Sequence, residues 1–300
     1  MSGRLGHGSP VRRLPEGRPD AELAMPATQE ALRDIPDQGK RTPDGSERLR
    51  GEHKRHHHTG SRVETVMPEL DTIAQTAERI LNADPDPVVR FRLLRDVLNH
   101  PPDTKQLQEA GERLETSRWV RQLGDEQWSD GSWGRLHSRD SGARQKIPNT
   151  EAGVERALAL GLDADHPVLR RASRYIVCVL DGTIKLRDRA EKNDRWPTGW
   201  RLFAASTLAQ IQPHHPVLDS IWELWLTVAR RTFASGAYDL QAEIRCHREL
   251  TGASVADSYL ALNNKYTLTL LGSRADALPR DLEAALFDWV WHNEGRRALP

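Results

Sequence analysis

Apolar residues recur every three or four positions from residue 69 to the C-terminus, and this spacing predicts α-helices without strands. The first apolar stripe contains Ile73, Ala77 and Leu81, and Asp86-Pro87 then caps a second helix. Further helices are expected over 103–114, 149–160, 167–180, 217–233 and 282–290. The pattern therefore indicates an all-α protein.

One segment of the chain occurs twice, about 50 residues apart. His166-Pro167-Val168-Leu169 reappears as His215-Pro216-Val217-Leu218, and each copy opens a helix that ends near a glycine, Gly182 or Gly236. A repeat of about 50 residues with two helices indicates stacked helical hairpins, and residues 67–300 leave room for about five. The 217–233 helix is apolar over a wide arc, as the inner layer of a ring of hairpins requires.

Residues 1–66 differ from the rest of the chain. Gly, Pro and charged residues dominate them and no apolar periodicity is sustained, which predicts disorder. The run from His53 to His58 offers imidazoles to a metal, although a solvated basic tail is the simpler interpretation. Because Met67 stands just before the first helical pattern, we hypothesise that translation starts there, with 67–300 as the folded domain.

Composition excludes several classes of function. Lys and Arg balance Asp and Glu at 43 each, which argues against a general nucleic-acid binder. No apolar run approaches the roughly 20 residues of a membrane span, and no secretory signal opens the chain, so a cytoplasmic protein is expected. Cys178 and Cys246 stand alone, which leaves neither a disulfide framework nor a zinc-ribbon spacing.

The most specific motif is Gln127-Trp128-Ser129-Asp130-Gly131-Ser132-Trp133-Gly134. It resembles the QW repeat of squalene cyclases and other terpenoid cyclases, which protein prenyltransferase β subunits share in looser form. The resemblance implies an α/α toroid in which Gln127 ends one helix and Asp130-Gly131 makes the turn. It further implies that Trp133 stacks over the start of the next helix. Degenerate echoes of the motif lie near residues 181 and 235.

The catalytic signatures of those enzymes are not found in this sequence. The acidic motif of terpenoid cyclases, Asp-x-Asp-Asp, has its nearest counterpart in Asp163-Ala164-Asp165-His166, where we interpret Asp165 as a helix cap. The prenyltransferase zinc is held by Asp, Cys and His. Cys246 and His247 are adjacent and would point about 100 degrees apart on a helix, so zinc is not required by the sequence.

One group of polar residues has the geometry of a site. Asp239, Glu243 and His247 are spaced i, i+4, i+8 on one face of an expected helix. They are the candidate catalytic residues, because two carboxylates and an imidazole can bind a metal ion or poise the histidine as a general base. The alternative is a solvated face whose charges pair with Arg245 or Arg248.

Two polar loops supply the candidates for ligand binding. Basic side chains next to tryptophans can hold an isoprenoid diphosphate, with the cations on the phosphates and the rings along the prenyl tail. The residues in question are Arg135, His137, Arg139, Lys185, Arg187, Trp196 and Trp200. Asp140, Asp181 and Asp188 dilute this positive charge.

Three functions are consistent with these observations. The first is a toroid that binds an apolar or isoprenoid-like ligand in its central cavity without catalysis. The second is an enzyme of the cyclase or prenyltransferase type with a non-standard acid or metal site. The third is a helical-repeat scaffold that binds another protein on its concave surface.

Overall fold

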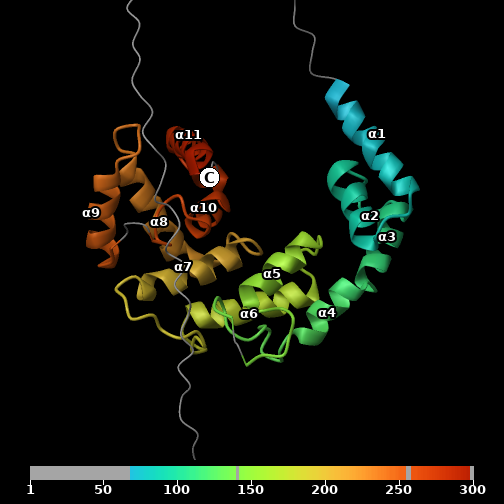
Figure 1. Ribbon diagram of the computed structural model, residues 1–300, viewed down its shortest axis with the longest axis horizontal. Coiled ribbons are helices and arrows are strands. Elements are labelled where there is room, and N and C mark those ends of the chain that lie inside the picture. The colour runs from blue at the N-terminus through green and yellow to red at the C-terminus, as the bar shows by residue number, and fades with distance from the viewer. Residues whose placement is uncertain (1–67, 140–141, 255–257, 298–300) are drawn as a thin grey trace, which may run out of the picture. The chain divides into compact units, whose positions relative to one another are not determined.

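The described part of the chain is built from helices alone. The computed structural model describes residues 68–139, 142–254 and 258–297, and no strand occurs within these ranges (Figure 1). The predicted all-α class is therefore confirmed. The predicted disorder of 1–66, the histidine run and the proposed start at Met67 lie outside the described residues.

Most of the helices follow one another with short connections. Their bounds are α1 Pro68–Asn82, α2 Pro87–Arg92, η1 Leu93–Val97, α3 Lys105–Glu115, α4 Arg118–Glu126, α5 Thr150–Ala159, α6 Pro167–Leu180, α7 Trp196–Ala209, η2 Pro216–Leu218, α8 Asp219–Thr232, α9 Leu240–Thr251, α10 Lys265–Gly272, η3 Ala275–Ala277 and α11 Arg280–Arg297. The two longest loops separate α4 from α5 and α6 from α7, and a third long connection separates α9 from α10. None of these helices is long and apolar enough to cross a membrane.

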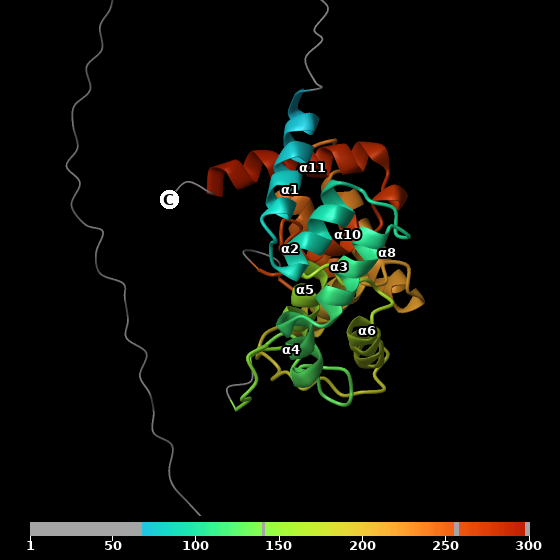
Figure 2. The same cartoon turned by 90° about the vertical axis from the view of Figure 1, so that its right-hand side faces the viewer.

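The helices share two apolar cores. A small core between α1, η1 and α3 consists of Leu81, Leu94, Leu107 and Ala110 (Figure 2). A larger core runs from the end of α3 to α11, and α7 is its main inner helix because it packs against α5, α6, α8 and α10. All eight residues of 202–209 in α7 are buried. Trp196, which we had placed in a polar loop, instead begins this helix and is buried.

The repeated His-Pro-Val-Leu segments are capped in the same way, although the first begins an α-helix and the second a 3₁₀ turn. His166 caps α6 and His215 caps η2, which leads directly into α8, and in each case Nδ1 accepts a hydrogen bond from the N–H two residues later. Proline follows each cap at the first helical position, where a missing N–H costs nothing. The interpretation of Asp165 as the cap is wrong. His166 holds that position, and Asp163 instead accepts from the backbone N–H groups of Asp165 and His166.

The glutamine-tryptophan turn joins three helices. Gln127 is the C-cap of α4, and its Nε2 donates to the carbonyl oxygens of Gly131 and of Val168 in α6. Trp133 is fully buried and donates from Nε1 to the carbonyl of Leu123, 3.0 Å away. Its ring lies against Gly153 of α5, where a Cβ atom would come within 2.4 Å of the indole. The turn therefore fixes α5 and α6 relative to α4.

Candidate functional site

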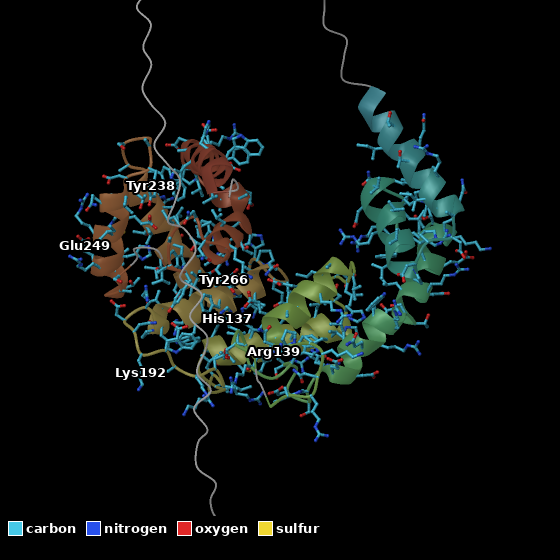
Figure 3. The ribbon with its side chains drawn as sticks, viewed as in Figure 1. His137, Arg139, Lys192, Tyr238, Glu249 and Tyr266 are labelled. Atoms are coloured by element: carbon cyan, nitrogen blue, oxygen red, sulfur yellow. The ribbon has the colours of Figure 1, made fainter. Side chains whose placement is uncertain are left out.

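A buried carboxylate at the start of α5 collects three polar side chains. Glu151 accepts from His137 at 2.7 Å through Nδ1, from Lys265 at 2.9 Å through Nζ, and from the hydroxyl of Tyr266. The Tyr266 hydroxyl also lies 3.2 Å from His137 Nδ1, and Figure 3 labels both residues. We call His137, Glu151, Lys265 and Tyr266 the Glu151 cluster.

Three distant segments of sequence bring the Glu151 cluster together. His137 follows the glutamine-tryptophan turn, Glu151 lies in the first turn of α5, and Lys265 with Tyr266 forms the first turn of α10. Helix α5 starts here because the side chain of Asn149 caps it by accepting from the N–H of Ala152. The same Asn149 donates from Nδ2 to the carbonyl of His137, which ties the loop to the helix start.

Asp188 holds the loop that carries His137. Its buried carboxylate accepts from three consecutive backbone N–H groups, those of Leu136 at 2.7 Å, His137 at 3.0 Å and Ser138 at 2.6 Å. The Ser138 hydroxyl is a fourth donor, at 2.9 Å. Charge-assisted hydrogen bonds of this kind are the strong ones, so the main chain at His137 is fixed.

The His137 ring is held on one side and open on the other. It stacks on Phe203 of α7 with ring centroids 4.3 Å apart, and Tyr266 meets it edge-on. Its side chain keeps 35% of its surface exposed. Among the described residues, Nε2 has no hydrogen-bond partner, whereas Nδ1 is bound to Glu151. The open nitrogen is therefore the one available to a ligand.

The protonation states in the Glu151 cluster follow from its contacts. Burial raises the pKa of Glu151, but the hydrogen bonds from His137, Tyr266 and Lys265 outweigh it and lower the pKa overall. Burial lowers the pKa of Lys265, and the charges of Glu151 and Glu155 more than offset this and raise it. Burial and the Glu151 carboxylate both raise the pKa of Tyr266. At neutral pH, Glu151 and Lys265 are thus charged and Tyr266 keeps its proton.

The sequence candidates Asp239, Glu243 and His247 do not form one group. Asp239 is exposed and caps α9 by accepting from the N–H groups of Gln241 and Ala242. Glu243 and His247 are buried, with Oε1 and Nε2 3.8 Å apart. The interpretation of this face as solvated is therefore wrong for Glu243 and His247, because α8 and the segment before α10 cover it.

The buried Glu243–His247 pair is isolated from solvent. Glu243 accepts from the Tyr238 hydroxyl at 2.6 Å and from the N–H of Leu262 at 2.8 Å. Burial raises its pKa more than these hydrogen bonds lower it. Burial also lowers the pKa of His247 to about 4, so this imidazole is neutral at physiological pH. Neither of its nitrogens has a hydrogen-bond partner among the described residues, since 3.8 Å from Nε2 to Glu243 is too long for one.

The candidate ligand-binding residues separate into different environments. Arg187 is structural, since it pairs with Asp130, donates to Ser132 and lies over the Trp128 ring. Trp196 is buried in the large core and Trp200 is half-buried beneath Arg201. Arg135 donates to the carbonyl of the exposed Arg139, and Lys185 is exposed. Of the seven, His137 alone belongs to the Glu151 cluster.

The sequence reasoning missed Glu151, Asp188, Lys265 and Tyr266. One signal was present for Glu151, because it lies three residues before Val154 and seven before Leu158, on the apolar stripe of α5. A charged residue on a buried stripe is unusual unless it is paired. No signal of this kind marks Asp188, whose partners lie about 50 residues earlier in the loop.

A metal site is not evident in the part of the chain that the structure describes, since no group of three or more His, Cys, Asp or Glu side chains is placed to hold an ion. Both cysteines are free. Comparison with known proteins gives no relative: no family model, no curated protein and no solved structure matches the chain. Function is therefore inferred from the geometry of the site.

Proposed function

We propose that the protein moves a proton to or from a bound organic ligand, with His137 as the general base and acid. The observation that carries this proposal is the asymmetry of the His137 ring. Nδ1 is 2.7 Å from the buried Glu151 carboxylate, whereas Nε2 is open. A carboxylate that orients an imidazole and leaves its second nitrogen free is the arrangement used by histidine bases.

The steps follow from the contacts. Glu151 keeps the proton on Nδ1, so Nε2 presents its lone pair to an acidic hydrogen of the ligand. When Nε2 takes this proton, the imidazolium forms beside a carboxylate that stabilises its charge. Lys265 bonds the other carboxylate oxygen and keeps Glu151 ionised. The proton returns from Nε2 to the ligand, and general acid–base catalysis of this type contributes roughly 10²–10⁴-fold.

Aromatic rings near His137 support an apolar, isoprenoid-like ligand. Phe203 contacts the His137 ring and also Tyr259 and Tyr266, with centroids 5.1 Å and 4.4 Å from its own. Phe203 and Tyr266 are buried, so the partly exposed Tyr259 is the ring of this group that can face a ligand, and an aromatic ring favours apolar or unsaturated groups over strongly hydrated ones. The resemblance of the glutamine-tryptophan turn to terpenoid cyclases supports the same ligand class, and with it a partial α/α toroid.

The experiment compares lipid extracts incubated in D₂O with the full chain and with His137→Gln. A proton-transfer enzyme produces new or deuterium-labelled molecules, which mass spectrometry detects, and His137→Gln abolishes them. His100→Gln is the matched control, because His100 is only half-buried and lies before α3. If the unmodified chain and His137→Gln have equal melting temperatures and give the same mass spectra, the protein does not catalyse this proton transfer. The proposal is then reduced to ligand binding without catalysis.

A scaffold for another protein is the second candidate. It is favoured by exposed apolar side chains at both ends of the described helices. Ile73 and Val89 are exposed near the start, and Phe287 and Trp291 in α11 keep 65% and 71% of their surface in solvent. The double variant Phe287→Ser and Trp291→Ser should then lose the cross-link to a partner protein that the unmodified chain forms. Its melting temperature should not fall, because both side chains are exposed. Unchanged cross-linking would remove this candidate.

A further inference from the structure

A polar pocket of about 240 Å³ lies between α1, α2 and α3, away from the Glu151 cluster. These helices are neighbours in Figure 2, and the small apolar core lies between them. Leu81, Leu94 and Ala110 of that core supply the apolar part of the pocket lining. The pocket is thus built on a packed surface and not on a loop.

The polar lining is unusually rich in unused hydrogen-bonding groups. It combines two guanidinium groups, from Arg90 and Arg113, with two carboxylates, from Glu78 and Glu109. The side chains of Arg113 and Glu78 make no hydrogen bond or ion pair to any other described residue, and the carboxylate of Glu109 has only Lys105, at 3.7 Å. The lining therefore offers both signs of charge to a ligand.

Arg90 is the most informative of these side chains. Its Nη2 donates to the carbonyl of Leu81 and to Asp84, each at 3.0 Å, so the guanidinium is held in position. Its Nε is buried and unpaired, whereas Nη1 is not buried and also has no acceptor in the described part of the protein. A guanidinium that is already held in position loses little side-chain freedom when a ligand carboxylate accepts from its unpaired nitrogen.

The size of the pocket limits the ligand. A volume of about 240 Å³ is several times the roughly 30 Å³ that one water takes in the liquid. It is below the roughly 300 Å³ at which pockets for drug-sized molecules begin. The pocket therefore suits a small molecule, and its carboxylates and guanidinium groups match one that carries both a cationic and an anionic group.

We propose that this pocket binds a free amino acid. The carboxylate of the ligand accepts from Arg90 and Arg113, its ammonium group donates to Glu78 and Glu109, and its side chain lies against the apolar lining. Carboxylate–guanidinium pairs are among the stronger charge-assisted hydrogen bonds, which makes the two arginines the determinants of affinity. This site does not depend on the proton-transfer function of the Glu151 cluster.

Isothermal titration calorimetry of the full chain with each of the twenty free L-amino acids tests the proposal. We expect a subset of them to bind, and Arg113→Gln to weaken binding by about tenfold or more. Arg90→Lys, which keeps the charge but removes the planar guanidinium with its Nη1 donor, should weaken it similarly. Arg121→Gln in α4 is the matched control, since Arg121 is an exposed helix arginine outside the pocket, and should change nothing.

Acetate and methylammonium, which each carry one half of the zwitterion, serve as comparison probes and should bind more weakly than the amino acid. If no amino acid produces heat of binding at a concentration of roughly 10 mM, any affinity is weaker than millimolar and the proposal is wrong. It is equally wrong if Arg113→Gln and Arg90→Lys bind as the unmodified chain does. Acetate binding as tightly as the amino acid would reduce the site to an anion site and overturn the assigned ligand.

Discussion

Two glutamate–histidine pairs with a buried carboxylate occur in the described part of this protein, and they differ in the properties that decide their chemistry. In the first, Glu151 and His137 are 2.7 Å apart, the carboxylate is buried and the imidazole is partly exposed. In the second, Glu243 and His247 are 3.8 Å apart and both are buried. Only the first has a cation, Lys265, on its carboxylate. Burial with a positive partner keeps a glutamate charged, whereas burial without one raises its pKa.

The comparison teaches that residue type and helical spacing do not identify a site. Glu243 and His247 have the i, i+4 spacing that draws attention in a sequence, yet their face is covered and the histidine is neutral and enclosed. Glu151 and His137 have no regular spacing, because one lies on a helix and the other in a loop. Solvent access at His137 Nε2 is what makes the first pair suited to proton transfer.

The largest effect that would separate the pairs is on activity. His137→Gln should lower the His137-dependent reaction by about 10²–10⁴-fold, because it removes the base. His247→Gln should leave the rate unchanged at temperatures at which the variant is folded, since the buried His247 cannot contact the ligand. The rate is measured by deuterium incorporation into the ligand. An equal loss in both variants would contradict the assignment of the active pair.

The next largest effect concerns stability at acidic pH. The pKa of His247 is about 4 in the folded protein against 6.5 as the ordinary value, so between these values the unfolded chain binds more protons. The free energy of unfolding should therefore fall as pH decreases from 6.5 to 4, with His247 contributing about 3 kcal/mol of this loss. Urea unfolding at pH 7 and pH 4.5 measures it.

His247→Gln should reduce this pH dependence, and His214→Gln, at an exposed histidine, should not. Glu243 acts in the opposite sense, because its pKa is raised and its protonation at lower pH favours the folded state. The difference in the pH dependence of the free energy of unfolding between His247→Gln and the unmodified chain gives the contribution of His247. Identical curves for the chain and His247→Gln would show that His247 titrates normally and is not enclosed.

A smaller effect is expected from the carboxylate of the first pair. Glu151→Gln should destabilise the protein by about 1–3 kcal/mol at pH 7, because the amide is a weaker acceptor for His137 and Lys265. The pKa of Glu151 is lowered, so its stabilising contribution is present above its ordinary pKa of 4.5 and is lost as pH falls through the lowered value. The difference between the two proteins in urea should therefore shrink towards pH 3. A difference that grew with acid would contradict the charged state of Glu151.

The smallest effect is expected at Lys265. Its side chain is 60% exposed, so Lys265→Met should cost no more than about 1 kcal/mol in the same urea experiment at pH 7. Lys105→Met is the matched control, because Lys105 is more exposed and forms only a long pair with Glu109. A cost of several kcal/mol at Lys265 would mean that the cation is essential to the fold and not only to the charge of Glu151.

Much of the helical architecture was readable in the sequence. The stripe of Leu107, Ala110 and Leu114 is buried in α3 as its spacing predicted. The glycines after α6 and α8, Gly182 and Gly236, both have the left-handed backbone that their positions predicted. Helices α7 and α10 were not predicted, because α7 is apolar on most sides and α10 is short, so neither has a clear periodic stripe.

The candidate site was predicted only in part. His137 was among the ligand-binding candidates, but its partners were not identified, and Glu151 was interpreted only as the beginning of a helix. The cluster joins residues up to 129 positions apart, such as Tyr266 and His137. A contact between residues so far apart in the sequence cannot be found from apolar periodicity, because periodicity shows only which residues share a face of one helix.

The sequence by itself determined the all-helical class, the cap at Asp86 and the glycines that follow α6 and α8. These features depend on interactions within a few residues, such as a cap with its first turn or a glycine with its own backbone. The tertiary structure alone decided which polar side chains would be enclosed. It placed α10 beside α7, which brought Lys265 and Tyr266 to Glu151, and it covered His247 while leaving His137 open. Burial and charge pairing depend on which helices pack together, and these set the chemistry of the two pairs.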